Sequence, residues 1–342
     1  MDSFNGYMKG INLGGWLSQC DHSEERYAGF ITERDFEILA GWGIDHVRVP
    51  VDYDLVETKD GDLKESGFAH IQDAIDWAGN YRLNMILDLH KTFGYSFDDG
   101  EQEAGFFENT AYQERFYRLW EQFAERFGKF KDRLAFELLN EVTDRAYCDV
   151  WNQIADQCIK RIRKIAPDIN ILIGGYYNNS VTAVKDLLPP ADEHIIYNFH
   201  CYDPLIFTHQ GAYWIPSMKK DLQISVRSTY AALREASEQS LLPVPPESSR
   251  FDKDDRLGPA YFEALFEEAV QVAQERNVRL YCGEYGVIDR ASADDVLLWY
   301  EWIHAAFEKY GIGRAAWSYK EMDFGLSDSR LDTQRERLLT LL

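Results

Sequence analysis

The segment Arg133–Glu141 reads RLAFELLNE, a short apolar run that leads directly into Asn140 and Glu141. A carboxylate at the end of a buried strand loses hydration, so it must be paired, hydrogen-bonded or protonated. An isolated pair of this kind most often serves as a helix cap or an ion-pair partner, but the same conditions tune catalytic acids. The segment Val278–Gly286, VRLYCGEYG, repeats the arrangement with Glu284 beside glycines. The repetition predicts two carboxylates at strand ends.

Around these segments, strand-like and helix-like stretches alternate along the chain. The expected strands cover residues 8–13, 44–50, 84–90, 133–140, 169–173, 194–202, 278–286 and 313–319, and the expected helices lie near 32–41, 68–81, 112–127, 147–166, 180–188, 260–276, 293–310 and 331–341. Repeated strand-helix units predict right-handed crossovers and a parallel sheet. Eight units, without a Gly-x-Gly-x-x-Gly after the first strand, favour closure. We therefore expect residues 1–342 to form one α/β domain, a (β/α)8 TIM barrel.

One connection is too long for a simple loop. Residues 205–258 separate the sixth strand from the next helix, and they include a helical pattern near 218–240 followed by a Pro-rich, charged stretch that begins at Pro243. Structureless loops of this length are uncommon in compact domains. We expect residues 205–258 to form an inserted subdomain after strand six, on the catalytic face.

The composition is that of a large folded domain with an acidic surface. Of 342 residues, 45% are hydrophobic, and 58 acidic residues against 36 basic ones give a net charge of −22. This charge argues against nucleic acid or an anionic membrane surface as a partner. No stretch reaches the roughly 20 apolar residues of a membrane helix, and the first residues lack a signal-peptide pattern. A cytoplasmic monomer is expected; a secreted protein whose leader has been removed would read the same.

Several chemistries lack their sequence signatures. The five cysteines are scattered without a Cys-x-x-Cys, which predicts reduced thiols rather than a zinc site or a disulfide framework. Neither His-x-His nor His-Glu-x-x-His occurs, so no catalytic metal is expected, and no cofactor motif is present. The absence of Gly-x-Ser-x-Gly argues against a serine hydrolase.

Polar residues close most of the expected strands. In such barrels the loops after the strands build the active site, so these side chains are expected to meet there. They are Arg48, His90, Asn140, Glu141, His200, Tyr202, Glu284 and Trp317. His200 and Tyr202 are two residues apart and therefore share one side of their strand. Arg48 lies within an apolar run, where a guanidinium needs a buried acidic partner.

Paired carboxylates are typical of glycosidic bond cleavage, in which one protonates the leaving oxygen and the other attacks the anomeric carbon or activates water. Flat aromatic rings in the catalytic-face loops could stack on sugars. The candidates are Trp317, Trp16, Phe207, Tyr213 and Trp214, and for each of them packing beneath a loop is an equally good interpretation.

An ordered set of motifs carries a resemblance over essentially the whole chain. The motifs are GINLGGW at 10–16, HVRVP at 46–50, LDLH at 87–90, LLNE at 138–141, YNFHCY at 197–202, GEYG at 283–286 and AW at 316–317. Together they resemble glycoside hydrolase family 5, the retaining cellulase-type barrels. The long segment after strand six is similar to that of the clostridial, lichenase-type branch.

The resemblance implies Glu141 as acid/base, Glu284 as nucleophile and Asn140 as the partner of the sugar 2-hydroxyl. It also implies supporting roles around the cleaved bond, listed here: Arg48, His90, His200, Tyr202 and Trp317. Val142 follows Glu141 where the family often has proline, a departure that concerns the loop more than the chemistry.

The substrate implied is a β-glucan, cleaved at internal β-1,4 bonds of cellulose-type and mixed-linkage β-1,3-1,4 chains. Outer subsites choose the polymer, so a β-mannanase, an exo-β-1,3-glucanase or an oligosaccharide-specific β-glucosidase stays open. From a different class, an inactive carbohydrate-binding barrel would keep the fold without turnover.

Overall fold

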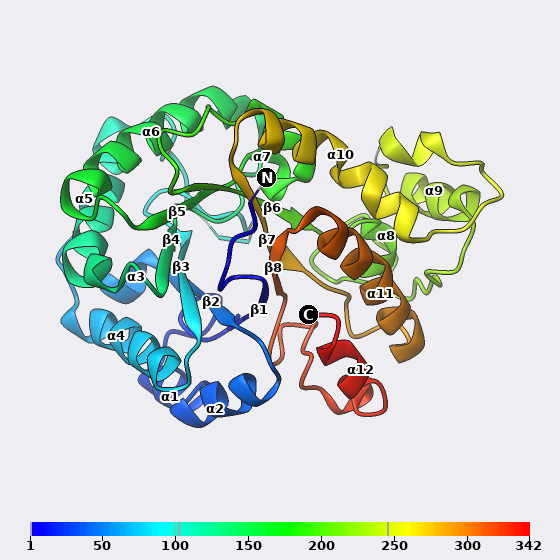
Figure 1. Ribbon diagram of the computed structural model, residues 1–342, viewed down its shortest axis with the longest axis horizontal. Coiled ribbons are helices and arrows are strands. Elements are labelled where there is room, and N and C mark those ends of the chain that lie inside the picture. Colours follow the sequence, from blue (N-terminus) through cyan, green and yellow to red (C-terminus); the bar gives the residue numbers. More distant parts are fainter. Residues whose placement is uncertain (1, 99, 102, 245) are drawn as a thin grey trace.

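The computed structural model describes residues 2–98, 100–101, 103–244 and 246–342. Eight parallel strands close into a barrel in sequence order, and helices surround it (Figure 1). The strands are β1 (Lys9–Asn12), β2 (His46–Asp52), β3 (Asn84–Lys91), β4 (Leu134–Glu137), β5 (Asn170–Ile173), β6 (Ile195–Cys201), β7 (Arg279–Tyr285) and β8 (Gly313–Ala316). The expected TIM barrel is confirmed.

The α-helices are α1 (Glu24–Gly29), α2 (Glu33–Gly41), α3 (Tyr53–Val56), α4 (Glu65–Asn80), α5 (Thr110–Phe127), α6 (Cys148–Ile165), α7 (Tyr176–Asn179), α8 (Leu205–Thr208), α9 (Tyr230–Gln239), α10 (Pro259–Glu275), α11 (Ala293–Tyr310) and α12 (Arg335–Leu339). Short 3-10 turns are η1 (Gly128–Phe130), η2 (Arg145–Tyr147), η3 (Val181–Asp186), η4 (Pro246–Arg250) and η5 (Ser329–Leu331). The capping box of Thr32 and Asp35 begins α2.

Three expected helices differ from the structure. The helix expected at 218–240 begins only at Tyr230, because Thr229 caps it and turns occupy the preceding residues. The stretch expected as a helix at 180–188 is the 3-10 turn η3, and the last expected helix shortens to α12. Each difference lies where local turn chemistry limits a helical pattern.

Side chains that point into the barrel form layers, because alternate residues of a strand share a side. The layer at the N-terminal end of the barrel is apolar, and Phe4 and Tyr7 from the N-terminus pack against it. Its strand members include Ile86, Ala135, Ile196 and Tyr281. Two residues further along β3, β4 and β6 stand Asp88, Glu137 and Asn198, all fully buried. The barrel therefore changes from apolar to polar towards its C-terminal end.

The connection from β6 to α10 carries α8, α9 and η4, and α9 projects beyond the helical ring (Figure 1). Pro245, within the Pro-rich stretch, lies outside the described residues. The division of the chain into a barrel and a 205–258 subdomain stays a prediction.

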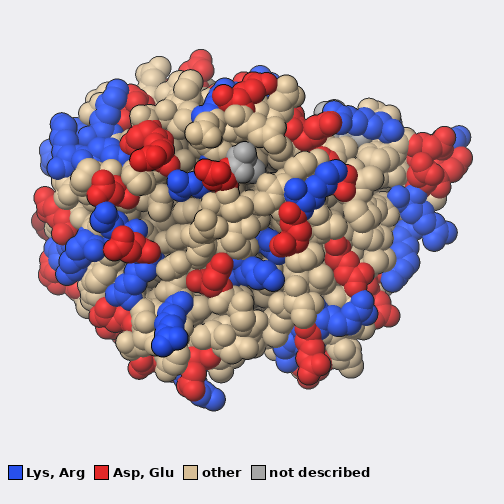
Figure 2. All heavy atoms as spheres, viewed as in Figure 1, with Lys and Arg blue, Asp and Glu red and all other residues tan. Residues whose placement is uncertain are grey.

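The structure shows how the charged side chains are distributed on one face and the state of the cysteines. On the face drawn in Figure 2, acidic and basic side chains are interspersed rather than gathered by sign. All five cysteines are free thiols, as predicted. Among the described residues, no helix is both long and apolar enough to cross a membrane.

Candidate active site

Arg48 is the centre of the polar layer inside the barrel. Its Nε and Nη2 donate to the two carboxylate oxygens of Glu137 at 2.7 and 2.8 Å, and Nη2 lies 3.0 Å from Asp88. Its Nη1 donates to Glu284 Oε1 at 2.8 Å. Burial lowers the pKa of Arg48, but the three carboxylates outweigh that effect and raise it well above its usual value. The expected buried acidic partner of Arg48 is confirmed, with three carboxylates.

Glu284 is the penultimate residue of β7, and its carboxylate contacts a cation and a phenol. Besides Arg48, it accepts a hydrogen bond from the Tyr202 hydroxyl at 2.9 Å, and His200 Nδ1 lies 3.6 Å away. Gly283 makes this geometry possible, because a Cβ there would come within about 3.0 Å of Asn198 and His200. The ladder between β6 and β7 shifts register at this point, which brings His200 opposite Glu284.

Glu141 follows β4 and has neutral partners instead. His200 Nδ1 lies 2.7 Å from its Oε1, and the Asn178 amide donates to its Oε2 at 2.8 Å. Burial lowers the pKa of His200 to about 4, so the ring is neutral near pH 7. Burial raises the pKa of Glu141, and the hydrogen bond from Asn178 acts against that rise. Glu141 is therefore held in surroundings that favour a protonated carboxyl.

The two carboxylates lie close together. One oxygen of Glu141, one of Glu284 and one ring nitrogen of His200 are all within 4.8 Å of one another. This spacing brings both carboxyl groups to one reacting centre, and the same three atoms could hold a cation. A second group with metal-ligand spacing consists of His22, Asp52 and Asp54.

His90 and Trp317 form one wall of the site. Their rings are stacked, with centroids 5.8 Å apart and planes 2° apart. Asp88 fixes the imidazole through a 2.6 Å contact to Nδ1. Gly14 packs against the indole, where a Cβ would lie 2.8 Å from it. With Asn140, whose Oδ1 accepts from Arg48 at 2.9 Å, all eight polar strand-end residues converge as expected.

The aromatic candidates divide into exposed and buried rings. Trp214 and Tyr213 are 41% and 65% exposed, and Trp214 lies beside His209. Trp16 and Phe207 are fully buried, which corrects their expected role. The Trp16 indole stacks on Trp77 and donates to a backbone carbonyl, so these rings are core residues and their faces are covered by protein.

Sequence reasoning missed the residues that hold the others in place. Asp88 and Glu137 carried a usable signal, because an acid within an apolar strand needs a partner, as Arg48 does. Asn12 also lacked a role in that reasoning, yet it accepts from Arg48 at 2.9 Å. Asn178 gave no signal. It reaches Glu141 from a left-handed turn with φ 56°, a conformation that asparagine tolerates better than most residues.

Comparisons with known proteins find relatives over most of the chain. The chain is 48% identical over 309 residues to Cellodextrinase A of Ruminococcus flavefaciens, covering 90% of this chain and 84% of that protein. It is 35% identical to Endoglucanase C of Acetivibrio thermocellus, covering 98% of both chains. The structure of the clostridial cellulose synthase subunit Z of Clostridioides difficile superposes with a TM-score of 0.78 at 25% identity, covering 98% of this chain and 99% of that one. The model of the family Cellulase (glycosyl hydrolase family 5) matches residues 9–323, and the chain belongs to that family.

Proposed function

We propose that this glycoside hydrolase cleaves β-1,4-glucosidic bonds of cellulose-type chains and soluble cello-oligosaccharides with retention of anomeric configuration. The observation that carries the proposal is the spacing of Glu141 and Glu284, whose nearest ligand atoms lie within 4.8 Å. Retaining glycosidases keep their carboxyl groups about 5 to 5.5 Å apart, whereas inverting ones leave about 6.5 to 9.5 Å for a water molecule. The short spacing supports direct attack by a carboxylate.

The surroundings of the two carboxylates support opposite roles. Glu284 forms an ion pair with Arg48 and accepts from Tyr202, as a charged nucleophile requires. Glu141 touches a neutral imidazole and an amide, and its raised pKa is that of a general acid. We therefore assign Glu284 as the nucleophile and Glu141 as the acid/base.

The proposed reaction has two displacements. Glu284 attacks the anomeric carbon while Glu141 gives its proton to the departing glycosidic oxygen, which leaves a covalent glycosyl-enzyme. Glu141, now ionised, takes a proton from water, and that water releases the sugar from Glu284. Arg48 fixes the Asn140 carbonyl oxygen, so the amide nitrogen of Asn140 is the group that would donate to a sugar hydroxyl.

The names of two relatives support action on short chains in addition to polymers, and two exposed rings offer a place for a sugar. The relative at 48% identity is named a cellodextrinase, and the one at 35% an endoglucanase. Trp214 and Tyr213 expose their rings on the connection from β6 to α10, and Trp214 lies near Phe324, which contacts Tyr202. A sugar residue stacked on the Trp214 indole would lie close to Glu284.

The test is the rate of reducing-sugar release from five substrates by the wild type and by Glu284→Ala. The substrates are carboxymethyl-cellulose, mixed-linkage β-glucan, mannan, laminarin and cellotetraose. We expect the wild type to release sugar from carboxymethyl-cellulose, cellotetraose and mixed-linkage β-glucan. We expect Glu284→Ala to lose this activity. Activity on mannan or laminarin alone would contradict the proposed substrate, and no activity on any of the five would support a binding protein instead.

A further inference from the structure

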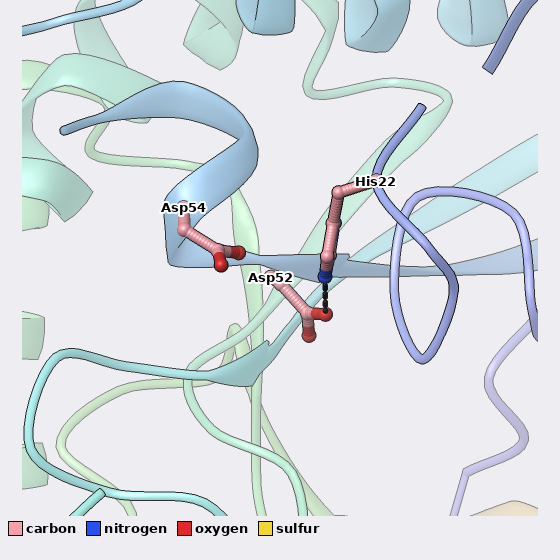
Figure 3. A group of neighbouring side chains, drawn as sticks. All are labelled: His22, Asp52 and Asp54. Atoms are coloured by element: carbon pink, nitrogen blue, oxygen red, sulfur yellow. Dashed lines mark ion pairs between the residues drawn. The ribbon is translucent and has the colours of Figure 1, made fainter. Parts of the chain in front are cut away.

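A second cluster of ligand-type side chains lies at the C-terminal end of β2, and it contains neither Glu141 nor Glu284. His22 comes from the loop before α1, Asp52 ends β2, and Asp54 stands in α3 (Figure 3). One nitrogen or oxygen from each residue lies within 4.8 Å of the others. The catalytic mechanism uses none of these three groups.

The second contacts of these side chains orient them. His22 Nδ1 is 2.8 Å from the Tyr27 hydroxyl, which leaves Nε2 facing Asp52 Oδ2 at 3.5 Å. Asp52 is buried, and it accepts from the Ser18 hydroxyl at 2.7 Å and from the backbone N–H of Gln19 at 3.1 Å. Histidine ligands of metals commonly have their other ring nitrogen hydrogen-bonded in this way.

Asp54 supplies a carboxylate oxygen that no described residue satisfies. Its Oδ1 is buried and has no hydrogen-bond partner among the described residues. Lys91 is the nearby cation, but its ammonium lies 3.6 Å from Asp52 and donates to both oxygens of Glu101 at 3.0 Å. A buried carboxylate oxygen without a partner is costly, and a bound cation would remove that cost.

A cavity opens onto the cluster. It has a volume of about 330 Å³, and His22, Tyr27, Asp54 and His70 are among the residues that line it. An ion and its water ligands could therefore reach His22 and Asp54 from solvent.

We propose that His22, Asp52 and Asp54 bind a divalent transition-metal cation, with Zn²⁺ as the best match. Two ligand atoms about 2.1 Å from one ion at a tetrahedral angle are about 3.4 Å apart, close to the observed 3.5 Å between His22 Nε2 and Asp52 Oδ2. The imidazole favours Zn²⁺ over Ca²⁺ or Mg²⁺, and the two carboxylates balance the charge of the divalent ion. Water from the cavity would complete the coordination.

Such an ion would hold the β1–α1 connection against the end of β2. Leu17 of that connection already pairs with Val51, and Gly14 of the same connection packs against Trp317. The ion thus adds a cross-link beside a wall of the active site, and its role is structural.

Calorimetric titration of EDTA-treated protein with Zn²⁺ tests the proposal, using the wild type, His22→Ala, Asp54→Asn and the control His70→Ala. His70 lines the same cavity but is not part of the cluster. The first two variants are expected to weaken one Zn²⁺ site at least tenfold and to abolish the rise in melting temperature that Zn²⁺ gives the wild type. The control is expected to keep both. Asp54→Asn preserves the shape of the side chain, so a folding defect in His22→Ala leaves the test intact.

Equal Zn²⁺ affinity in the wild type, His22→Ala and Asp54→Asn would overturn the proposal. Zn²⁺ bound instead by Glu141, His200 and Glu284 would give this result, and it would also inhibit hydrolysis in all variants alike. Titrations with Ca²⁺ and Mg²⁺ are expected to be at least tenfold weaker than with Zn²⁺. A tighter Ca²⁺ site lost in Asp54→Asn would overturn the assignment of the cation class.

Discussion

Glu141 and Glu284 are the same side chain, at ends of strands in the same barrel, with opposite surroundings. Glu284 contacts a guanidinium that can only be positive, while Glu141 contacts an amide and an imidazole that burial keeps neutral. His200 lies beside both carboxylates. The difference teaches that the proposed roles follow from the neighbours, since the surroundings of a carboxyl group set its charge.

Removing Glu284 is the most severe way to break this comparison. Glu284→Ala is expected to lower kcat on cellotetraose by about 10⁴-fold or more, because no other group can form the covalent intermediate. Far-ultraviolet circular dichroism of the variant should match the wild type. A loss smaller than tenfold would remove Glu284 from the nucleophile's role.

Removing Glu141 should give a loss that depends on the leaving group. Glu141→Gln is expected to lower kcat/KM on cellotetraose by about 10² to 10⁴-fold, because the leaving sugar needs a proton. The leaving group of a dinitrophenyl cellobioside departs without protonation, so kcat/KM of Glu141→Gln on this substrate should fall much less. Equal losses on the two substrates would contradict the assignment of Glu141 as general acid.

The ion pairs that hold Arg48 can be weakened without changing Glu141 or Glu284. Glu137→Gln removes the charge that Arg48 meets at 2.7 Å in a fully buried site. The free energy of unfolding, measured in urea, is expected to fall by about 3 kcal/mol, because the buried cation loses a partner. The control Glu65→Gln removes the exposed ion pair to Arg126 and should leave the urea midpoint nearly unchanged. Equal midpoints for the two variants would contradict the importance of the buried pair.

The smallest expected effect is a shift in the pH profile, and it would sharpen the comparison of Glu141 with Glu284. The Asn178 hydrogen bond lowers the pKa of Glu141, so Asn178→Gly is expected to raise it. A general acid works only while protonated, so activity falls as pH rises through its pKa. The alkaline limb of kcat/KM should therefore move to higher pH, by less than about one unit.

Glycine suits this test because the φ of residue 178 is 56°. The control is Asn277→Gly, another asparagine with positive φ, which follows α10 just before β7 begins and should leave the profile unchanged. A shift to lower pH in Asn178→Gly would contradict the sign of this interaction.

The fold and much of the site could be predicted because both depend on local patterns. An apolar strand that ends in a charged residue is visible in the sequence, and barrel topology brings such ends together. Burial of Trp16 and Phe207 could not be predicted, because it depends on which helices and loops cover each ring. The start of α9 was missed because the polar turns before Thr229 compete with a helical pattern.

Two further groups escaped prediction for lack of a spacing signal. Asn178 reaches Glu141 only through a left-handed turn after β5. His22 lies thirty residues before Asp52, with no ligand motif between them, and only the barrel brings the two together.

The most direct test of the opposite roles of Glu141 and Glu284 is to trap the covalent intermediate. A 2-deoxy-2-fluoro-β-cellobioside with a dinitrophenyl leaving group should react once with the wild type and then release its sugar slowly, because fluorine slows the second displacement. Mass spectrometry of the digested protein should find the sugar on Glu284. Sugar attached to Glu141, or no adduct together with products of inverted configuration by nuclear magnetic resonance, would contradict the account.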